Sequence, residues 1–241
     1  MSLTYTSYLA AMSELTVIAE TDENFIAIMP SVIDYAEQRI YRELDMLVED
    51  VRDSSASTTA SNRNFTLPTS VGTFQIITGI NIITPASTAP DSGARNVCTP
   101  VSLSVLDFSY PSTTGAGVPT MFNYFSQGGG QTNIVFGPWP DASYRVEVIG
   151  KIVPTALSAS NPTTFLTLYL PDLFLAASMV FMTGYLKNFG AQSDDPKQAQ
   201  SWETQYMTLK ASAESWEARK RFAGASWTSM QVEPSAVPQR G

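Results

Sequence analysis

The stretch Pro30-Ser-Val-Ile-Asp-Tyr-Ala-Glu-Gln-Arg-Ile-Tyr-Arg-Glu-Leu-Asp-Met-Leu47 decides the fold class of the N-terminal part of the chain. Its apolar residues recur at spacings of three and four, which is one face of an α-helix: Ile33, Ala36, Ile40, Leu44 and Leu47. Polar side chains fill the opposite face: Asp34, Glu37, Gln38, Arg42 and Asp45. Because a helix tolerates proline in its first turn, the pattern predicts a helix that begins at Pro30.

The residues on either side of this stretch set its boundaries. Thr21, Asp22 and Asn24 are typical of turns and helix caps, so we expect an earlier helix from about Thr4 to Ala19. On the other side, residues 53–64 read DSSASTTASNRN, a polar run of small residues without periodicity. Such a run is typical of a link between structural regions.

After this link, the spacing of the apolar residues changes to every second position, which is typical of β-strands. Five segments are rich in β-branched or aromatic residues or alternate with polar ones: Phe74–Thr84, Val97–Phe108, Met121–Phe125, Thr132–Phe136 and Tyr144–Val148. Glycine and proline turns separate them, among them Gly128–Gly130 and the Pro138-Trp-Pro140 run. Short strands without intervening helices predict an antiparallel β-sandwich or small barrel.

Helical patterns return at Pro171. Residues Leu173–Met182 are apolar on nearly all sides, which predicts a buried helix. A last helix is expected from Pro196, after Asp194 and Asp195, to Gly224, because apolar residues repeat at four, three, four and three: Trp202, Tyr206, Leu209, Ala213 and Trp216. The chain is therefore predicted as α+β, with N- and C-terminal helices in one bundle and the β-module inserted between them.

This interpretation divides the chain into four parts. Residues 1–52 and 156–224 supply the helices of the bundle, residues 53–155 form the β-module, and residues 225–241 form an extended C-terminal arm. The arm holds Pro234 and Pro238, which exclude a continuous helix, but also Trp227, Met230 and Val232. Two interpretations stay open: a disordered tail, or an arm that lays these apolar side chains into a neighbouring molecule.

Composition excludes several classes of function. The 241 residues contain no histidine and a single cysteine, Cys98, so histidine-dependent catalysis, an intrachain disulfide and multi-cysteine zinc sites are excluded. The net charge of −8 is unlike that of nucleic-acid-binding proteins, and ten of the 22 acidic residues lie in residues 1–52. No secretory signal is evident, and Pro171 and Asp172 split the most apolar stretch, so we expect no membrane association and synthesis in a cytoplasm.

No residue pattern in the sequence predicts a catalytic, cofactor or metal site. Gly128–Gly130 lacks the lysine of a phosphate-binding loop and is typical of a hairpin tip. The carboxylates that could act as acid or base have simpler structural explanations as caps, turn residues or outward-facing strand residues: Asp107, Asp141, Glu147, Asp194 and Asp195. Trp139, with Tyr124 and Tyr144, is compatible with a sugar-binding face, and this is the basis of an alternative function.

In the order of its segments, the chain resembles the head-to-tail adaptor proteins of short-tailed bacteriophages. Four stretches carry the resemblance. The Ala-Glu-Gln-Arg-Ile-Tyr-Arg-Glu-Leu44 core is similar to the second helix of that family, and Gly117-Val-Pro119 with the aromatics after it is similar to a family strand. Ile134-Val-Phe-Gly-Pro-Trp-Pro-Asp141 resembles the family's hairpin, and Leu170-Pro-Asp-Leu173 resembles the start of its third helix.

The resemblance implies a structural virion protein at the head–tail junction rather than an enzyme. It implies a ring, twelvefold in the family, that joins the portal protein to the tail nozzle, with contacts to tail fibres open. Double-stranded DNA would pass through the ring without specific binding. Two sets of residues become candidates in this setting: Trp227, Met230 and Val232 for portal binding, and Asp34, Glu37, Asp45, Glu49 and Asp50 for an acidic channel lining. The alternative is a carbohydrate- or receptor-binding β-module of a phage tail or surface protein.

Overall fold

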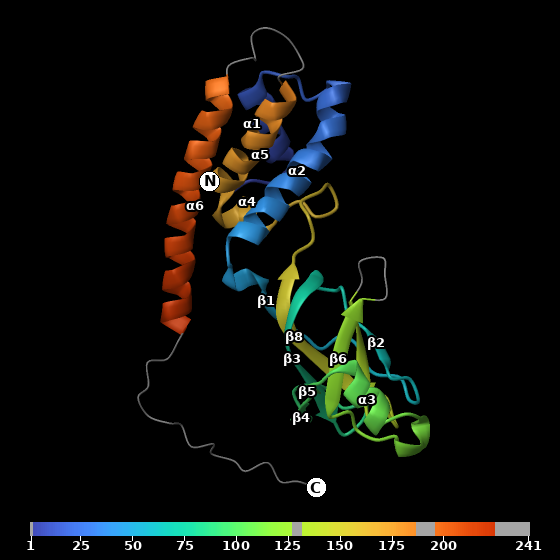
Figure 1. Cartoon of the computed structure of the whole chain (residues 1–241). Coiled ribbons are helices and arrows are strands. Elements are labelled where there is room, and N and C mark those ends of the chain that lie inside the picture. The colour runs from blue at the N-terminus through green and yellow to red at the C-terminus, as the bar shows by residue number, and fades with distance from the viewer. Residues whose placement is uncertain (1, 127–131, 187–195, 225–241) are drawn as a thin grey trace.

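The computed structural model describes residues 2–126, 132–186 and 196–224 of the 241-residue chain. These residues form a mixed α+β protein with six α-helices and two four-stranded sheets, and the sheets do not close into a barrel within the described ranges. The helices α1, α2, α4, α5 and α6 gather at one end, and the strands lie with α3 at the other (Figure 1).

The N-terminal helices begin at side-chain caps. Helix α1 spans Tyr5–Thr16, and Thr4 caps it through a bond from the Ser7 N–H. Helix α2 spans Glu23–Glu43, and the Asp22 carboxylate accepts the N–H groups of Asn24 and Phe25. The prediction that this helix starts at Pro30 is wrong, because Phe25 and Met29 extend the buried face backwards and Pro30 lies inside α2.

Helix α2 also ends earlier than its sequence pattern indicates. Its C-cap is Leu44, and Leu47–Glu49 form a 3₁₀ turn that leads directly into strand β1, Asp50–Asp53. The Leu47 side chain is therefore exposed rather than part of the buried stripe. The first strand thus starts before the polar run 53–64, so the change from helix to strand is abrupt.

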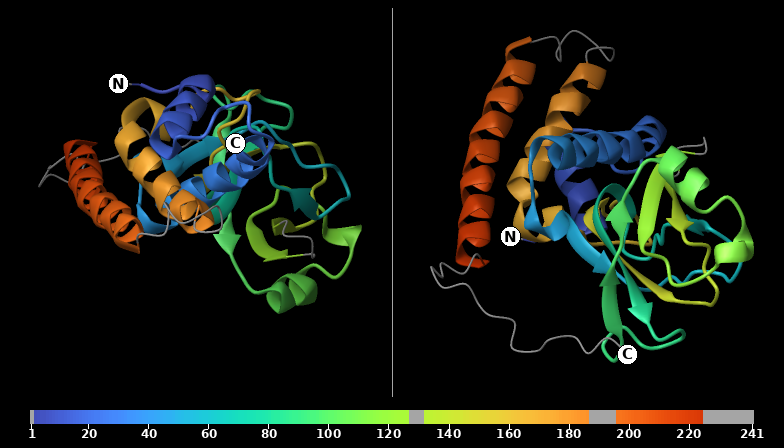
Figure 2. Two further views of the ribbon diagram at one scale, coloured as in Figure 1. Left: turned by 90° about the horizontal axis from the view of Figure 1, so that it is seen from above. Right: turned by 60° about the horizontal axis from the view of Figure 1, so that its bottom comes forward.

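Three further helices follow strand β8 in the C-terminal part of the sequence. Helix α4 spans Phe165–Tyr169, α5 spans Pro171–Leu186 and α6 spans Pro196–Gly224. Helix α5 lies between α6 and α2, and α6 runs along its side and extends beyond it (Figure 2). The predicted buried helix is confirmed, since Leu173, Phe174 and Met182 are buried. The predicted cap residues Asp194 and Asp195 lie outside the described residues.

The strands form two sheets. One sheet has the order β1-β8-β3-β4, in which β8 is Arg145–Val153, β3 is Thr73–Thr84 and β4 is Ala94–Val97. The other has the order β2-β7-β6-β5, with β2 Asn64–Thr66, β7 Thr132–Gly137, β6 Met121–Ser126 and β5 Thr99–Pro100. All pairs are antiparallel except β5 with β6, which is parallel and departs from the predicted all-antiparallel pattern.

The predicted strand Val97–Phe108 is the largest local error. Only its first residues are strand, and Leu103–Ser109 form helix α3. Within α3 only Leu106 is buried, whereas Leu103, Val105 and Phe108 are exposed, so the apparent alternation with serine does not reflect a sheet face. Cys98 joins β4 to β5, and its thiol is buried and donates to the Pro119 carbonyl, as expected for a core cysteine.

Two hydrophobic clusters occupy the two ends of the described structure. The first includes Tyr8, Met29, Ile40 and Phe174 from the helices. The second includes Ile82 and Val148 of one sheet together with Ile134 and Phe136 of the other, so both sheets share it. No described helix is both long enough and apolar enough to cross a membrane.

Candidate interaction surfaces

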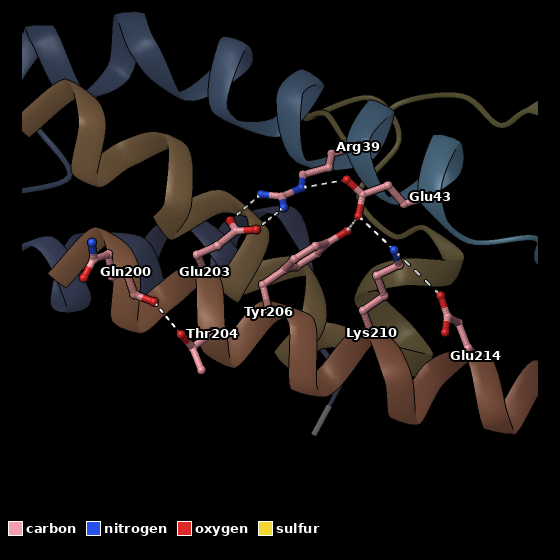
Figure 3. A network of polar contacts seen from close by, with 8 residues as sticks. All are labelled: Arg39, Glu43, Gln200, Glu203, Thr204, Tyr206, Lys210 and Glu214. Carbon is pink, nitrogen blue, oxygen red and sulfur yellow. Dashed lines mark hydrogen bonds and ion pairs between the residues drawn. The ribbon is translucent and has the colours of Figure 1, made fainter. Parts of the chain in front are cut away.

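Helix α6 is fixed to α2 by a network of charged side chains (Figure 3). Both terminal nitrogens of Arg39 on α2 donate to the carboxylate of Glu203 on α6, at 2.9 and 2.6 Å. The Nε of Arg39 donates to Glu43 at 3.1 Å. Planar, two-point pairing of this kind fixes orientation as well as distance.

Glu43 connects this pair to two more side chains of α6. Its second oxygen accepts the Tyr206 hydroxyl at 2.9 Å and lies 3.3 Å from Lys210 Nζ. The Arg39 guanidinium lies over the Tyr206 ring, 4.1 Å from its centroid. Burial raises the pKa of Glu43, but hydrogen bonds from Tyr206 and Arg39 outweigh it and lower the pKa below its usual value. The carboxylate therefore stays ionised and holds both helices.

A second ionic cluster joins the helices to the strands. Arg221 on α6 lies 2.9 Å from Asp45 and 3.5 Å from Asp50, and Lys151 on β8 pairs with the same two carboxylates. The hydrogen bond from Lys151 is the main cause of a lowered pKa of Asp45. These four residues lie where α2 passes into β1, so they connect three elements at one point.

The last turns of α6 have a third anchor. Glu217 is buried and accepts the backbone N–H of Leu47 at 3.0 Å and Lys220 Nζ at 2.6 Å. Lys220 Nζ also lies 3.3 Å from the ring centroid of Trp216. The sequence pattern indicated an apolar stripe on α6, but it gave no sign of these polar anchors, whose partners lie far away along the chain.

The candidate acidic residues fall into two groups. Asp34, Asp45 and Asp50 are exposed, whereas Glu37 and Glu49 are buried. Glu37 was placed on the polar outer face of its helix, and that placement is wrong, because its carboxylate accepts the Leu157 N–H at 3.0 Å inside the protein. Burial raises the pKa of Glu37, and likewise that of Glu49, to about 7.

The candidate portal-binding residues Trp227, Met230 and Val232 lie outside the described residues. Exposed apolar side chains are present elsewhere, on α3 and at the end of β4. Phe108 is 89% exposed and Val97 75% exposed, and Leu103 and Val105 accompany them. These exposed apolar side chains are candidates for contact with other proteins.

The carboxylates considered for catalysis have structural roles where they are described. Asp107 pairs with Arg63, and Asp141 accepts the Tyr144 hydroxyl. Glu147, expected to point outward, is instead buried and accepts bonds from Asn81 and Arg95. Among the described residues, no three cysteine or acidic side chains are grouped so that they could hold a metal ion.

Trp139, on which the sugar-binding alternative is based, makes contacts within the protein. Its indole Nε1 donates to the Tyr110 carbonyl at 3.1 Å, and the Arg63 guanidinium lies 5.4 Å from its ring centroid. The ring thus helps to hold the segment before β6 against the hairpin. No observation at this position favours a carbohydrate ligand over that structural role.

Comparison with known families assigns the chain to a biological class. The family model described as SU10 adaptor protein matches residues 4–230, which is nearly the whole chain. The chain belongs to the SU10 adaptor protein family. A search of curated proteins found no match.

Family membership confirms the resemblance to phage adaptors drawn from the four sequence stretches. This SU10-family chain is thus a bacteriophage adaptor, a structural class that is not known for enzymatic activity. The class implies a component of the virion that associates with portal and tail proteins. The family model ends at residue 230, so it also covers residues 225–230, the first part of the predicted C-terminal arm.

Proposed function

We propose that this chain is the head-to-tail adaptor of its phage. Copies of it form a ring, twelvefold as in related adaptors, between the portal protein and the tail nozzle, with tail fibres as further neighbours. Double-stranded DNA passes through the ring during ejection without specific binding. The observation that carries this proposal is the match to an adaptor family over residues 4–230.

The composition of the chain supports a role in assembly. Only 15% of its residues are charged, and the centres of protein interfaces are depleted of charge. A ring closes by rotation and needs two different, complementary faces on each subunit. We assign the exposed apolar side chains of α3 to one such contact, and interpret the two hydrophobic clusters as a helical bundle with an inserted β-sandwich.

An acidic lining of the channel would prevent DNA from adhering, because phosphates are repelled at distances within the Debye length of about 8 Å. Of the candidate residues, Asp34, Asp45 and Asp50 are accessible for this role, and Glu37 and Glu49 are not. Lys151 and Arg221 already pair with two of the accessible carboxylates. The proposed repulsion therefore depends mainly on Asp34, which bonds only to neutral Gln38 among the described side chains.

The C-terminal arm is the proposed contact with the portal. Residues 225–241 follow directly after α6, and they carry Trp227, Met230 and Val232 in a segment with little charge. Apolar side chains on an arm gain free energy only when a neighbour buries them. We place the assembled protein at the head–tail junction of the virion, after synthesis in the cytoplasm of the bacterial host.

Imaging of the protein with its portal tests the proposal. Negative-stain images and mass photometry of the full chain mixed with purified portal should show rings seated on portal rings. The chain without residues 225–241 should remain folded by circular dichroism but bind the portal at least about tenfold more weakly, a loss of about 1.4 kcal/mol. A subunit that remains monomeric when offered the portal, or that binds glycans through Trp139, would contradict the proposal.

A further inference from the structure

The sheet β1-β8-β3-β4 has one face on the hydrophobic cluster that both sheets share and one face turned away from it. Val146 and Val148 of β8 belong to that cluster. Because side chains alternate between the two faces along a strand, Arg145, Glu147 and Ile149 lie on the opposite face. We call this opposite face the outer face of the sheet.

Three arginines share the outer face with one carboxylate. Buried Glu147 accepts a bond from Arg95 Nε of β4 at 3.1 Å, and Arg52 Nε of β1 lies 3.8 Å from it. Arg145 donates to the Ser55 carbonyl at 2.9 Å. The Arg52 side chain is 59% exposed and that of Arg95 is 37% exposed. One carboxylate balances one of these three guanidinium groups, so the outer face carries a surplus of positive charge.

Exposed apolar side chains accompany these charges. The strand register places Val97 of β4 opposite Asn81 of β3, which lies opposite Glu147 on its other side. Val97 is 75% exposed. Ile149 lies opposite Arg52 and is half-buried. The outer face therefore combines positive charge with apolar side chains that are candidates for contact with another molecule.

The turn between α1 and α2 has the opposite charge. The chain has no lysine or arginine before Arg39. Three exposed carboxylates lie in this turn and the helix ends beside it: Glu14, Glu20 and Glu23. None of the three forms an ion pair with a described residue. Three exposed apolar side chains lie among them: Leu15, Val17 and Ile26. We call residues 14–26 the acidic corner.

Val17 in this corner has a strained backbone. It caps the end of α1 at φ 58° and ψ 32°, a left-handed conformation that β-branched residues rarely adopt. Its side chain is 92% exposed. Burial of this side chain by another molecule would gain free energy, because apolar surface would leave water.

The acidic corner and the outer face are complementary, since their charges are opposite and both carry exposed apolar side chains. They cannot meet within one subunit, because α1 and the start of α2 lie at the end of the molecule away from β3 and β4 (Figure 1). A contact between them therefore needs two copies. Complementary charges favour association and fix orientation. A contact between two different faces repeats from copy to copy, and it closes into a ring where the rotation allows.

We propose that the outer face of the sheet β1-β8-β3-β4 binds the acidic corner of a second copy of this chain. The carboxylates of the corner face Arg52 and Arg95 of the next copy. Val17 packs beside them on Val97. The inference rests on the proposed ring, for which it names one pair of complementary faces, and it is separate from the contact assigned to α3.

Sedimentation equilibrium of the full chain without portal, at low and at high salt, tests this contact. The variants are Glu23→Lys in the corner and Arg52→Glu on the outer face. Asp34→Lys and Arg219→Glu are the matched controls, because they make the same charge changes at exposed positions outside both surfaces. Thermal unfolding of each variant checks that it is folded.

The wild type should self-associate at low salt, and less at high salt, because salt screens exposed charges. Glu23→Lys and Arg52→Glu should each weaken self-association about tenfold, since like charges then face each other. An equimolar mixture of the two variants should restore it, because alternating copies then attract at every contact. The two controls should associate as the wild type does.

Val17→Gly separates the contact from the stability of the subunit. Glycine adopts a positive φ without strain, so the unfolding temperature should stay the same or rise. Self-association should nevertheless weaken a few-fold, because the apolar contact on Val97 is lost. If Arg52→Glu fails to fold beside Glu147, Arg52→Gln should still weaken association, since it removes the positive charge without adding a second carboxylate.

Three results would overturn the contact: no salt-sensitive self-association of the wild type, folded variants that associate as the controls do, or a mixture that restores nothing. Negative-stain images with the portal distinguish this failure from that of the proposed function. Charge variants that form normal rings on the portal contradict the contact alone. A wild type that self-associates through these faces but never binds the portal contradicts the proposed function alone.

Discussion

Glu37 shows how a single buried carboxyl can affect the stability of the protein. Its side chain is 4% exposed, and burial raises its pKa to about 7, although the bond from the Leu157 N–H partly opposes the shift. The folded state thus holds a proton here more tightly than the unfolded chain does. The stabilisation is complete below about pH 4.5 and is lost as the pH rises through about 7.

Replacing Glu37 by glutamine should therefore stabilise the protein at pH 8 and have little effect at pH 4.5. The gain should reach at most about 3 kcal/mol, because each unit of pKa shift corresponds to about 1.4 kcal/mol. The amide oxygen can still accept the Leu157 N–H. Urea unfolding of wild type and variant between pH 4.5 and 8 measures the difference.

Glu14→Gln is the control for this experiment, since Glu14 is an exposed carboxyl on helix α1 and is not among the groups that shift the pKa of Glu37. Its unfolding free energy should follow that of the wild type at each pH. Part of the wild-type pH dependence should persist in Glu37→Gln, because Glu49 is shifted in the same direction. A variant as pH-dependent as the wild type would show that Glu37 is not the titrating group.

At the scale of elements, helix α6 depends on polar contacts more than its sequence pattern indicates. Tyr206 and Ala213 are buried as predicted, but Trp216 is 37% exposed under Lys220. The Arg39–Glu203 pair joins α2 and α6 across 164 positions of sequence. The orientation of α6 is therefore set by paired charges as well as by packing.

Glu203→Gln should loosen α6 without unfolding the other helices. It replaces a two-point ionic contact by a weaker neutral one, and since Glu203 is 41% exposed we expect a loss of only about 1 kcal/mol. Hydrogen exchange followed by mass spectrometry should show faster exchange in α6 than in α5. Glu214→Gln is the control, because Glu214 is 54% exposed and its ion pair with Lys210 is long, at 3.7 Å. This variant should change the exchange of α6 little. Equal effects of the two variants would argue against the Arg39 network as the anchor.

At the scale of the whole molecule, the two hydrophobic clusters share no residue among those described. They approach each other at Val48 and Val51, on either side of the start of β1. The ionic cluster of Asp45, Asp50 and Lys151 reinforces this junction. The helical and β ends are therefore joined by polar contacts as well as by the covalent chain.

We expect the two ends to lose stability separately. Phe136→Ala removes a fully buried ring from the β cluster and should cost about 3–5 kcal/mol. Hydrogen exchange should then increase in β3, β6, β7 and β8 while α2 and α5 remain protected. Phe174→Ala, in the helical cluster, should produce the reverse pattern. Uniform loss of protection in both variants would mean that the molecule unfolds as one unit.

The sequence alone was sufficient where periodicity decides structure. It predicted α1, the strands β3, β6, β7 and β8, the buried α5 and the end of α6, and the order of four local stretches indicated the adaptor family. It failed where local patterns compete. Serines between apolar residues resembled a strand where α3 forms, and a proline resembled a helix start although α2 begins at Glu23.

Only the tertiary structure decided which charges are buried and which partners they have. Glu37, Glu49 and Glu147 occupy positions that a helix or strand pattern assigns to solvent, yet neighbouring elements cover all three. Burial depends on what packs against an element from elsewhere in the chain, and a sequence period records only the element's own faces. For the same physical reason, the contact of Arg39 with Glu203 was visible only once the chain was folded.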